Sequence, residues 1–229
     1  MAQEKKIEII SANSLDKDEL LFPDANILKG SPNKQVHLSH DEMDIFSNNA
    51  IFFQRKNKFI ATGDVFLKQG DSLELKCDSL NYDGKIKKFF SYGKVYLINN
   101  KTTLNSNELL YDRKKNIASF FNGGNIIDSL TTIQSKKGDY LLEIDKYKFR
   151  NDITITNPDY VIESESLDYI VGQEKTYFLD STKITGDSYV ITCNRGFYDG
   201  KLMKGYFLDN AKIVLNERII RGDSIFFDD

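Results

Sequence analysis

Short runs of hydrophobic residues alternate with polar residues along the whole chain, at the two-residue period of β-strands. The runs are rich in Ile, Val, Phe and Tyr, and the Asn, Asp, Lys and Gly residues between them are typical of turns. No long segment shows the 3.6-residue period of an amphipathic helix. The pattern therefore predicts an all-β protein built from strands joined by turns.

The hydrophobic pattern itself repeats. YFLDSTKI at 177–184 returns 29 positions later as YFLDNAKI at 206–213. Extending this pair in both directions gives a column of Phe and, six residues after each Phe, a column of β-branched residues. The two columns are Phe59, Phe89, Phe120, Phe149, Phe178 and Phe207, and Val65, Val95, Ile126, Ile155, Ile184 and Ile213. The chain is thus predicted to contain about seven copies of one unit of about 29 residues.

Each unit has a further strand with three columns of its own. An aliphatic residue is followed two positions later by a small residue and seven positions later by an aromatic residue. The aliphatic column is Ile45, Leu75, Leu104, Ile133, Ile162, Ile191 and Ile220, and the aromatic column is Phe52, Tyr82, Tyr111, Tyr140, Tyr169, Tyr198 and Phe227. An offset of seven would place the two columns on opposite faces of an uninterrupted strand.

A bend in each unit would place the aliphatic and aromatic columns on the same face of the strand. The residue after the small position is Asn48, Asp78, Asn107, Lys136, Glu165, Asn194 or Asp223. A one-residue bulge there would return both columns to one face, and Asn and Asp tolerate unusual dihedrals. We therefore predict an elongated, bent β jelly roll, similar to a β-solenoid, with two facing antiparallel sheets around an apolar interior.

Charge and hydropathy exclude two classes of partner. The 31 Lys and Arg are interleaved with 34 Asp and Glu, which gives a net charge of −3 without the basic stripe that nucleic acid requires. No apolar run approaches the roughly 20 residues of a membrane-spanning helix. The opening MAQEKKIEII has no apolar stretch before a cleavage site, so we expect any signal peptide to have been removed.

The repeats predict one domain over residues 7–229, preceded by a flexible tail over 1–6. Residues 20–43 lengthen the first interval and are expected to form an irregular insertion. The final RIIRGDSIFFDD contains only half a unit, so we expect the polypeptide to continue or this end to pair with another module or copy by strand addition. Such head-to-tail contacts do not close into a dimer.

Candidate catalytic and metal-binding residues are few. His37 and His40, in HLSH, lie in a polar segment and are expected to be solvated loop residues instead of a metal site. Asp180 and Asp209 share one repeat position and would form a carboxylate pair or a cation site only if both faced the interior. We predict no enzyme activity, no bound metal and no cofactor.

The two cysteines are expected to be unpaired. Cys77 and Cys193 occupy the same position of units four copies apart. Strands spaced about 4.8 Å apart would separate them by at least about 19 Å, beyond the reach of a disulfide. Both are predicted to be buried thiols that pack as small apolar residues.

Three segments resemble the OstA/LptA family of lipopolysaccharide-transport proteins. They are IEIISANSL (7–15), CDSLNYDGKIKKFFSYGKVYL (77–97) and NSNELLYDRKKNIASFFNGGNI (105–126). The shared pattern is a small residue, Asp, an aliphatic residue and Tyr-Asp, then a turn, an aromatic residue and Gly-x-Val. Residues 20–43 and the loss of the Gly at Ile153, Thr182 and Ala211 depart from it.

The resemblance implies a periplasmic module that carries the acyl chains of lipid A toward the outer membrane in an apolar inner groove. Modules of this family join end to end by strand pairing. The candidate ligand-binding residues are Phe59, Val65, Leu75, Tyr82, Phe89, Val95, Leu104, Tyr111, Phe120, Ile126, Ile133, Phe149, Ile155, Ile162, Phe178, Ile184, Ile191, Phe207 and Ile213. Periodic apolar positions are also what a dry core requires, so a structural or adhesive β-repeat protein without a lipid ligand remains the alternative.

Overall fold

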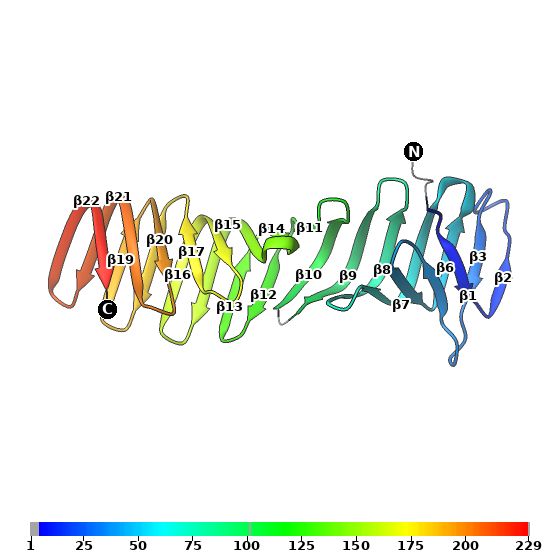
Figure 1. The fold of residues 1–229 in the computed structure, drawn as a ribbon, viewed down its shortest axis with the longest axis horizontal. Coiled ribbons are helices and arrows are strands. Elements are labelled where there is room, and N and C mark those ends of the chain that lie inside the picture. The colour runs from blue at the N-terminus through cyan, green and yellow to red at the C-terminus, as the bar shows by residue number, and fades with distance from the viewer. Residues whose placement is uncertain (1–4, 101, 229) are drawn as a thin grey trace. The chain divides into compact units, whose positions relative to one another are not determined.

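The computed structural model describes residues 5–100 and 102–228 (Figure 1). It forms two compact units, residues 1–117 and 118–229, where the repeats alone predict one domain over 7–229. The boundary falls inside β11 (Ile117–Phe120). The structure confirms the all-β prediction, because antiparallel strands account for nearly all the regular structure of both units.

The described residues of unit 1 form ten complete strands and one short 3₁₀ helix. The strands are β1 (Glu8–Ser11), β2 (Ser14–Asp16), β3 (Asn26–Lys29), β4 (Val36–Ser39), β5 (Met43–Ser47), β6 (Asn49–Phe53), β7 (Lys58–Gln69), β8 (Leu73–Asp83), β9 (Lys88–Asn99) and β10 (Thr102–Asp112). The 3₁₀ helix η1 (Gln54–Lys56) lies in the turn between β6 and β7.

Unit 2 continues the same pattern. Its strands after β11 are β12 (Gly124–Asp128), β13 (Thr131–Ser135), β14 (Lys137–Leu141), β15 (Lys146–Asn157), β16 (Tyr160–Ile170), β17 (Lys175–Phe178), β18 (Thr182–Gly186), β19 (Tyr189–Cys193), β20 (Arg195–Asp199), β21 (Lys204–Leu215) and β22 (Arg218–Asp228). The 3₁₀ helix η2 (Leu142–Ile144) joins β14 to β15.

Within each unit, the long consecutive strands, such as β7 with β8 and β15 with β16, lie side by side and are joined by tight turns (Figure 1). A long strand has two halves on either side of a bulge, and some copies are divided there into two short strands. The halves form two layers. In unit 1, layer 1 contains β1, β4, β5 and the halves 65–69, 73–77, 95–99 and 102–106, and layer 2 contains β2, β3, β6 and the halves 58–62, 79–83, 88–92 and 108–112.

The layers of unit 2 follow the same rule. Layer 1 contains β12, β13, β18, β19 and the halves 153–157, 160–164, 211–215 and 218–222. Layer 2 contains β14, β17, β20 and the halves 146–150, 166–170, 204–208 and 224–228. In both units the buried side chains alternate along most halves, as in β7 and β16, so the two layers of a unit enclose an apolar interior, whereas the terminal strand β22 buries only Phe227.

The bends occur where the sequence predicts them. The strand pairings skip the residue after each small position, as between Lys76 and Ser79 or between Ser106 and Glu108. The left-handed dihedrals, however, lie on the neighbouring strand. Two consecutive residues there have positive φ, in the pairs Gly63-Asp64, Gly93-Lys94, Asn151-Asp152 and Asp209-Asn210.

These pairs explain the apparent loss of glycine at Ile153 and Ala211. Gly adopts a left-handed conformation without a steric penalty, and Asn and Asp are the side chains that adopt it most readily otherwise. The Asn151-Asp152 and Asp209-Asn210 pairs therefore replace Gly63-Asp64 as the bend. Gly93 has a further role, because a Cβ there would lie 2.3 Å from Oδ2 of Asp78.

The strand register corrects the alignment of the Phe and β-branched columns. Phe59 lies opposite Tyr82, but the residue opposite the equivalent Tyr169 is Tyr147, and Phe149 lies opposite Leu167. The first two members of each column, Phe59 and Phe89 and Val65 and Val95, thus lie two residues before the positions that are equivalent to the last four members. Ala61, Ser91, Leu67 and Leu97 are the true equivalents of the later Phe and Ile positions.

Residues 20–43 are more regular than expected. They contain β3, which pairs with β2 and β6, and β4, which pairs with β1 and β5. Val36 and Leu38 point into the interior and are fully buried. The extra length lies in the turn over 17–25 and in the bend over 30–35, so the segment is a repeat with two enlarged connections.

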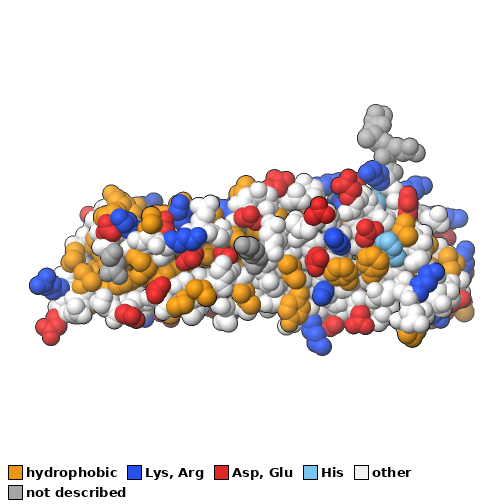
Figure 2. Space-filling model, turned by 60° about the horizontal axis from the view of Figure 1, so that its bottom comes forward, with side chains coloured by type: hydrophobic (Ala, Val, Ile, Leu, Met, Phe, Trp, Pro, Cys, Tyr) orange, Lys and Arg blue, Asp and Glu red, His pale blue; other side chains and the backbone are white. Residues whose placement is uncertain are grey.

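Exposed hydrophobic side chains lie among acidic and basic ones on the surface, as one face shows in Figure 2. None of the helices in the described residues has the length and apolar character needed to cross a membrane.

Candidate functional site

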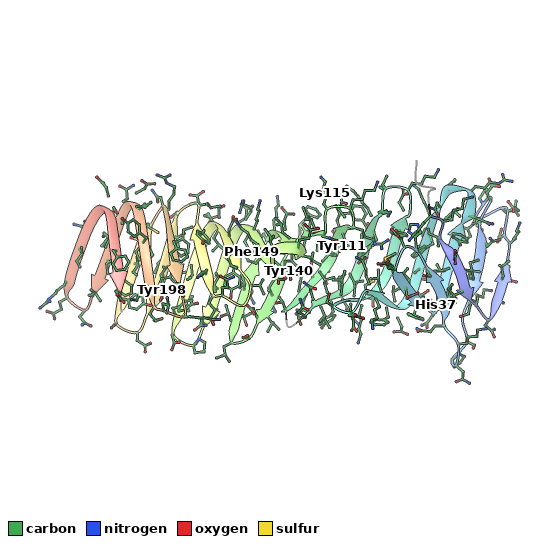
Figure 3. The ribbon with its side chains drawn as sticks, viewed as in Figure 1. His37, Tyr111, Lys115, Tyr140, Phe149 and Tyr198 are labelled. Carbon is green, nitrogen blue, oxygen red and sulfur yellow. The ribbon has the colours of Figure 1, made fainter. Side chains whose placement is uncertain are left out.

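The interiors of unit 1 and unit 2, each enclosed by its own two layers, together contain all nineteen candidate ligand-binding residues. Each of them is at most 2% exposed. In unit 1 the rings of Phe89 and Tyr111 are 5.1 Å apart. In unit 2, Tyr147 stacks between Tyr140, at 4.2 Å, and Phe149, at 5.1 Å. Figure 3 shows Tyr140, Phe149 and Tyr198 within unit 2.

One edge of the interior is bounded by the turns of both layers. We call this edge the mouth. In unit 1 the mouth is formed by the layer 1 turns after β4 and β7 and the layer 2 turns after β8 and β10. In unit 2 it is formed by the layer 1 turns after β12, β15 and β18 and the layer 2 turns after β16 and β20.

Arg113 closes the mouth of unit 1. From the turn after β10, its guanidinium donates hydrogen bonds to Oε1 of Gln69 (2.8 Å), the hydroxyl of Tyr82 (2.9 Å) and the carbonyls of His40 and Asp41 (3.3 and 2.6 Å). Gln69, His40 and Asp41 belong to layer 1, and Arg113 and Tyr82 to layer 2. One cationic side chain therefore ties the two layers together.

Asp41 adds ion pairs at the same place. Its carboxylate pairs with Lys87, from the layer 2 turn after β8, and with Lys5 at 2.9 Å. The side-chain hydrogen bonds from Lys87 and Lys5 hold the pKa of Asp41 well below its usual range. The carboxylate is therefore ionised at neutral pH.

The mouth of unit 2 is closed by Asp128, Asn157 and three tyrosines. Asp128 is 4% exposed and accepts hydrogen bonds from the hydroxyl of Tyr169 (3.0 Å) and the backbone N–H of Gly172 (2.8 Å). The amide of Asn157 donates to Glu174 at 3.4 Å. Tyr189 and Tyr198 share a hydrogen bond of 2.9 Å between their hydroxyls.

A single feature distinguishes the mouth from the rest of the sheet. Among the described residues, each hydrogen bond that crosses the mouth involves at least one side chain, whereas neighbouring strands are joined by backbone ladders. Side-chain rearrangement can therefore separate the layers at the mouth while every strand keeps its neighbours. The arrangement suits the reversible enclosure of an apolar ligand.

The two histidines are not solvated loop residues, contrary to the expectation from the sequence. His40 is 2% exposed, and its ring contacts the hydroxyl of Tyr82 at 2.6 Å and the carbonyl of Lys5 at 2.9 Å. Burial lowers its pKa, and the charge of Arg113 acts in the same direction. His37 lies on β4, stacks on Phe46 and pairs with Asp44 at 2.8 Å.

The described residues contain no group of three His, Cys, Asp or Glu side chains that could hold a metal ion. Asp180 and Asp209 do not face the interior. Asp180 is exposed and accepts a hydrogen bond from the backbone of Ser181, and Asp209 pairs with Arg195 on the surface. The arrangement required for a carboxylate pair is therefore not present.

Cys77 and Cys193 are both buried and unpaired, as predicted. Burial raises the pKa of each thiol to about 12. A thiol with such a pKa is protonated at neutral pH and is a poor nucleophile. Both residues act as small packing elements at their bends.

Sequence reasoning missed the side chains that close the mouth. Arg113 lies in DRKKN, which reads as a polar loop, and Asp128 follows a strand as an ordinary turn residue. Tyr147 was also missed, although its hydroxyl is buried and has no hydrogen-bond partner among the described residues. The spacing of two residues between Tyr147 and Phe149 is the one signal that places both in the interior.

The two layers, their bulges and the enclosed apolar interior define a bent-strand repeat protein. The chain belongs to the OstA-like protein family, whose model matches residues 4–165. Among solved structures, a match is LptH of Pseudomonas aeruginosa, described as the LptA-homologous periplasmic component of the lipopolysaccharide transport device. It is 14% identical with a TM-score of 0.42, over 45% of this chain and 79% of that one. Comparison with curated proteins gives no significant match.

Proposed function

We propose that this chain is a periplasmic lipid-binding and transport module that carries lipopolysaccharide toward the outer membrane. Lipid A acyl chains would lie against the nineteen interior residues, and the resemblance to the OstA/LptA family implies other transport modules as partners through end-to-end strand pairing. Membership of the OstA-like family supports this proposal. The observation that carries it is an apolar interior whose mouth, in the part of the chain that the structure describes, is crossed by hydrogen bonds that each involve at least one side chain.

The energies of opening and of lipid uptake are compatible. A hydrogen bond contributes about 0.5–1.5 kcal/mol net, or about 1.5–3 kcal/mol when one partner is charged. Opening the mouth of unit 2 breaks the contacts of Asp128, Asn157 and the Tyr189–Tyr198 pair, a cost of several kcal/mol. Burying an acyl chain returns about 0.8 kcal/mol per CH₂ group, so one chain of ordinary length offsets that cost.

The packed interior favours a second candidate, a structural β-repeat protein with a dry core. Phe89, Phe149 and Ile162 have no exposed surface, and the mouth is closed in this conformation. Such a protein would need no ligand, and its interior would stay inaccessible to lipid. The two candidates therefore differ in whether a lipid ever contacts an interior side chain.

Site-specific photocrosslinking separates them. Phe178 and Tyr177 are consecutive aromatic residues of β17, and Phe178 is 2% exposed whereas Tyr177 is 42% exposed on the outer face. A photoreactive phenylalanine analogue is placed at one position or the other, and the purified protein is irradiated with lipopolysaccharide. We expect a lipid adduct from position 178 and little from position 177. Equal labelling, or none at 178 in a folded protein, would favour the dry core.

A further inference from the structure

Three neighbouring turns of unit 1 are strongly basic. The turns cover residues 54–58, 83–88 and 112–116, and we call them the basic turns. They contain nine Lys and Arg, namely Arg55, Lys56, Lys58, Lys85, Lys87, Lys88, Arg113, Lys114 and Lys115, against two acidic residues, Asp83 and Asp112. In a protein with a net charge of −3, this is a concentrated positive region.

Backbone hydrogen bonds hold the basic turns beside one another. The N–H of Gly84 donates to the carbonyl of Asn57 at 2.8 Å, and the N–H of Arg113 donates to the carbonyl of Lys87 at 3.0 Å. The positive charge is therefore a fixed feature of three adjacent layer 2 turns, two of which, 83–88 and 112–116, border the mouth. Figure 3 shows Lys115 at the edge of the ribbon, outside the strands that enclose Tyr111.

Internal ion pairs compensate only part of this charge. Lys58 pairs with Asp83 at 2.6 Å, Lys88 with Asp112 at 3.0 Å, Arg55 with Asp24 at 3.3 Å, and Lys87 with Asp41. Lys85, Lys114 and Lys115 are exposed, and no carboxylate of the described residues lies within ion-pair distance of them. These three lysines present their charge to solvent.

An apolar hollow of about 490 Å³ adjoins the basic turns on the outer face of unit 1. Phe53, Ile60, Ile86 and Phe90 line it together with lysines of the first two turns, such as Lys56. Ile86 is 49% exposed and Phe90 is 43% exposed. Exposed apolar side chains bordered by lysines are typical of surfaces that contact the interface of a lipid assembly.

The corresponding turns of unit 2 provide an internal comparison. Residues 142–146, 170–175 and 199–204 contain four lysines and four acidic residues, so their charges balance. The repeat fold therefore does not require basic turns. The positive charge of the three basic turns is therefore not explained by the fold and calls for a separate explanation.

We propose that the basic turns bind the phosphate groups of lipid headgroups at the surface of a membrane or micelle, with the adjoining hollow receiving apolar groups from the same surface. This inference rests on the proposed function, because it places the phosphorylated head of a lipid beside the mouth through which its acyl chains enter. Clustered Lys and Arg side chains are well suited to binding phosphate, and Lys85, Lys114 and Lys115 are the exposed cations of this cluster.

Vesicle flotation tests the proposal with the full chain. The probes are vesicles of phosphatidylcholine alone and vesicles that also contain phosphatidic acid. The test variant is Lys85→Gln/Lys114→Gln/Lys115→Gln, and the matched control, Lys175→Gln/Lys201→Gln/Lys204→Gln, removes the same charge from the corresponding turns of unit 2. Each lysine near an anionic surface changes the affinity about fivefold, so the test variant should bind on the order of 100-fold more weakly.

We expect binding to the anionic vesicles only, weakening with salt, and a control variant within a few-fold of the unaltered protein. Inorganic phosphate in millimolar excess should not displace the vesicles. Displacement by phosphate would identify a site for the free anion and overturn the lipid assignment. Equal losses in the two variants, or equal binding to neutral vesicles, would refute the role of the basic turns.

This test stands apart from the crosslinking at Phe178. If flotation fails while the adduct at position 178 forms, the interior binds lipid and the basic turns have no part in it. If the adduct fails while flotation succeeds, the basic turns bind phosphorylated lipid surfaces and the interior is dry.

Discussion

Asp128 offers the sharpest test of how the mouth of unit 2 is held closed. Its carboxylate is buried and accepts one hydrogen bond from the phenol of Tyr169 and one from the backbone N–H of Gly172. In Asp128→Ala both donors lose their partner while they remain close to the apolar interior. Each hydrogen bond to a charged group contributes about 1.5–3 kcal/mol, and neighbouring contacts add less than fully.

We therefore expect Asp128→Ala to lower the free energy of unfolding by about 3 kcal/mol. For a unit of this size, the midpoint of thermal unfolding should fall by about 10 °C. The matched control is Asp187→Ala, because Asp187 is an exposed residue in a later layer 1 turn of the same unit. Its loss should change the stability by no more than about 0.5 kcal/mol.

Hydrogen exchange gives a local measurement of the same event. The amide of Gly172 should exchange faster in Asp128→Ala, because its acceptor is removed, whereas amides in the centre of β16 should keep their protection. Lipid uptake should also become faster, since the mouth opens more readily. The reasoning is refuted if the two variants unfold together and the exchange of Gly172 is unchanged.

Three further predictions concern the interior and its titratable groups. Phe149→Ala should cost about 3–5 kcal/mol in a denaturant titration, since the ring is fully buried, and Lys148→Ala on the opposite face should be nearly silent; the reverse order would invert the face assignment. Burial keeps the folded-state pKa of His40 below its usual value, so the unfolded chain takes up the proton first and stability should fall as the pH decreases below about 6.5. His40→Gln should remove that part of the pH dependence, and an unchanged slope would contradict the burial of a neutral ring. Cys77 and Cys193 should resist a thiol reagent in the native protein at neutral pH and both react after denaturation, so a count below two in denatured monomer would be inconsistent with unpaired cysteines.

The bend is the element that the sequence predicts best. An offset of seven between the aliphatic and aromatic columns is incompatible with a straight strand, and the structure has a bulge at the expected residues. The neighbouring strand was harder to interpret, because its bend requires two left-handed residues and Gly, Asn and Asp all satisfy that requirement. Glycine alone is therefore an incomplete marker of the bend, because Asn151 and Asp152 adopt the same left-handed conformation there.

The register error had a visible signal in the sequence. The intervals from Ile126 back to Val95 and from Val95 to Val65 are 31 and 30, whereas the later copies are spaced by 29. Taking Leu97 and Leu67 instead restores intervals of 29 and 30, and the strand pairings support that choice. Phe59 and Phe89 occupy a position two residues before the true equivalents, Ala61 and Ser91. Residues two apart on a strand lie on the same face, so a Phe can fill the interior from either position.

The mouth could not be predicted from the pattern. Arg113 contacts Gln69 and His40, which lie 44 and 73 residues away, and neither distance is a multiple of the repeat. Such contacts depend on which side chains of different copies meet when the layers close. The repeat determines where the mouth lies, and individual substitutions determine how it is held.

The pairing of strands within unit 2 has a consequence for how such chains can change in length. The most distant partners across a ladder, such as Tyr160 with Gly186 or Tyr189 with Leu215, are 26 residues apart. Because the ladders among the described residues of unit 2 reach no further than the neighbouring copy, the gain or loss of a whole copy by recombination would leave the other ladders intact. Local pairing of this kind also favours rapid folding that spreads from one copy to the next. The number of copies can therefore vary among related genes while the cross-section of the interior stays the same.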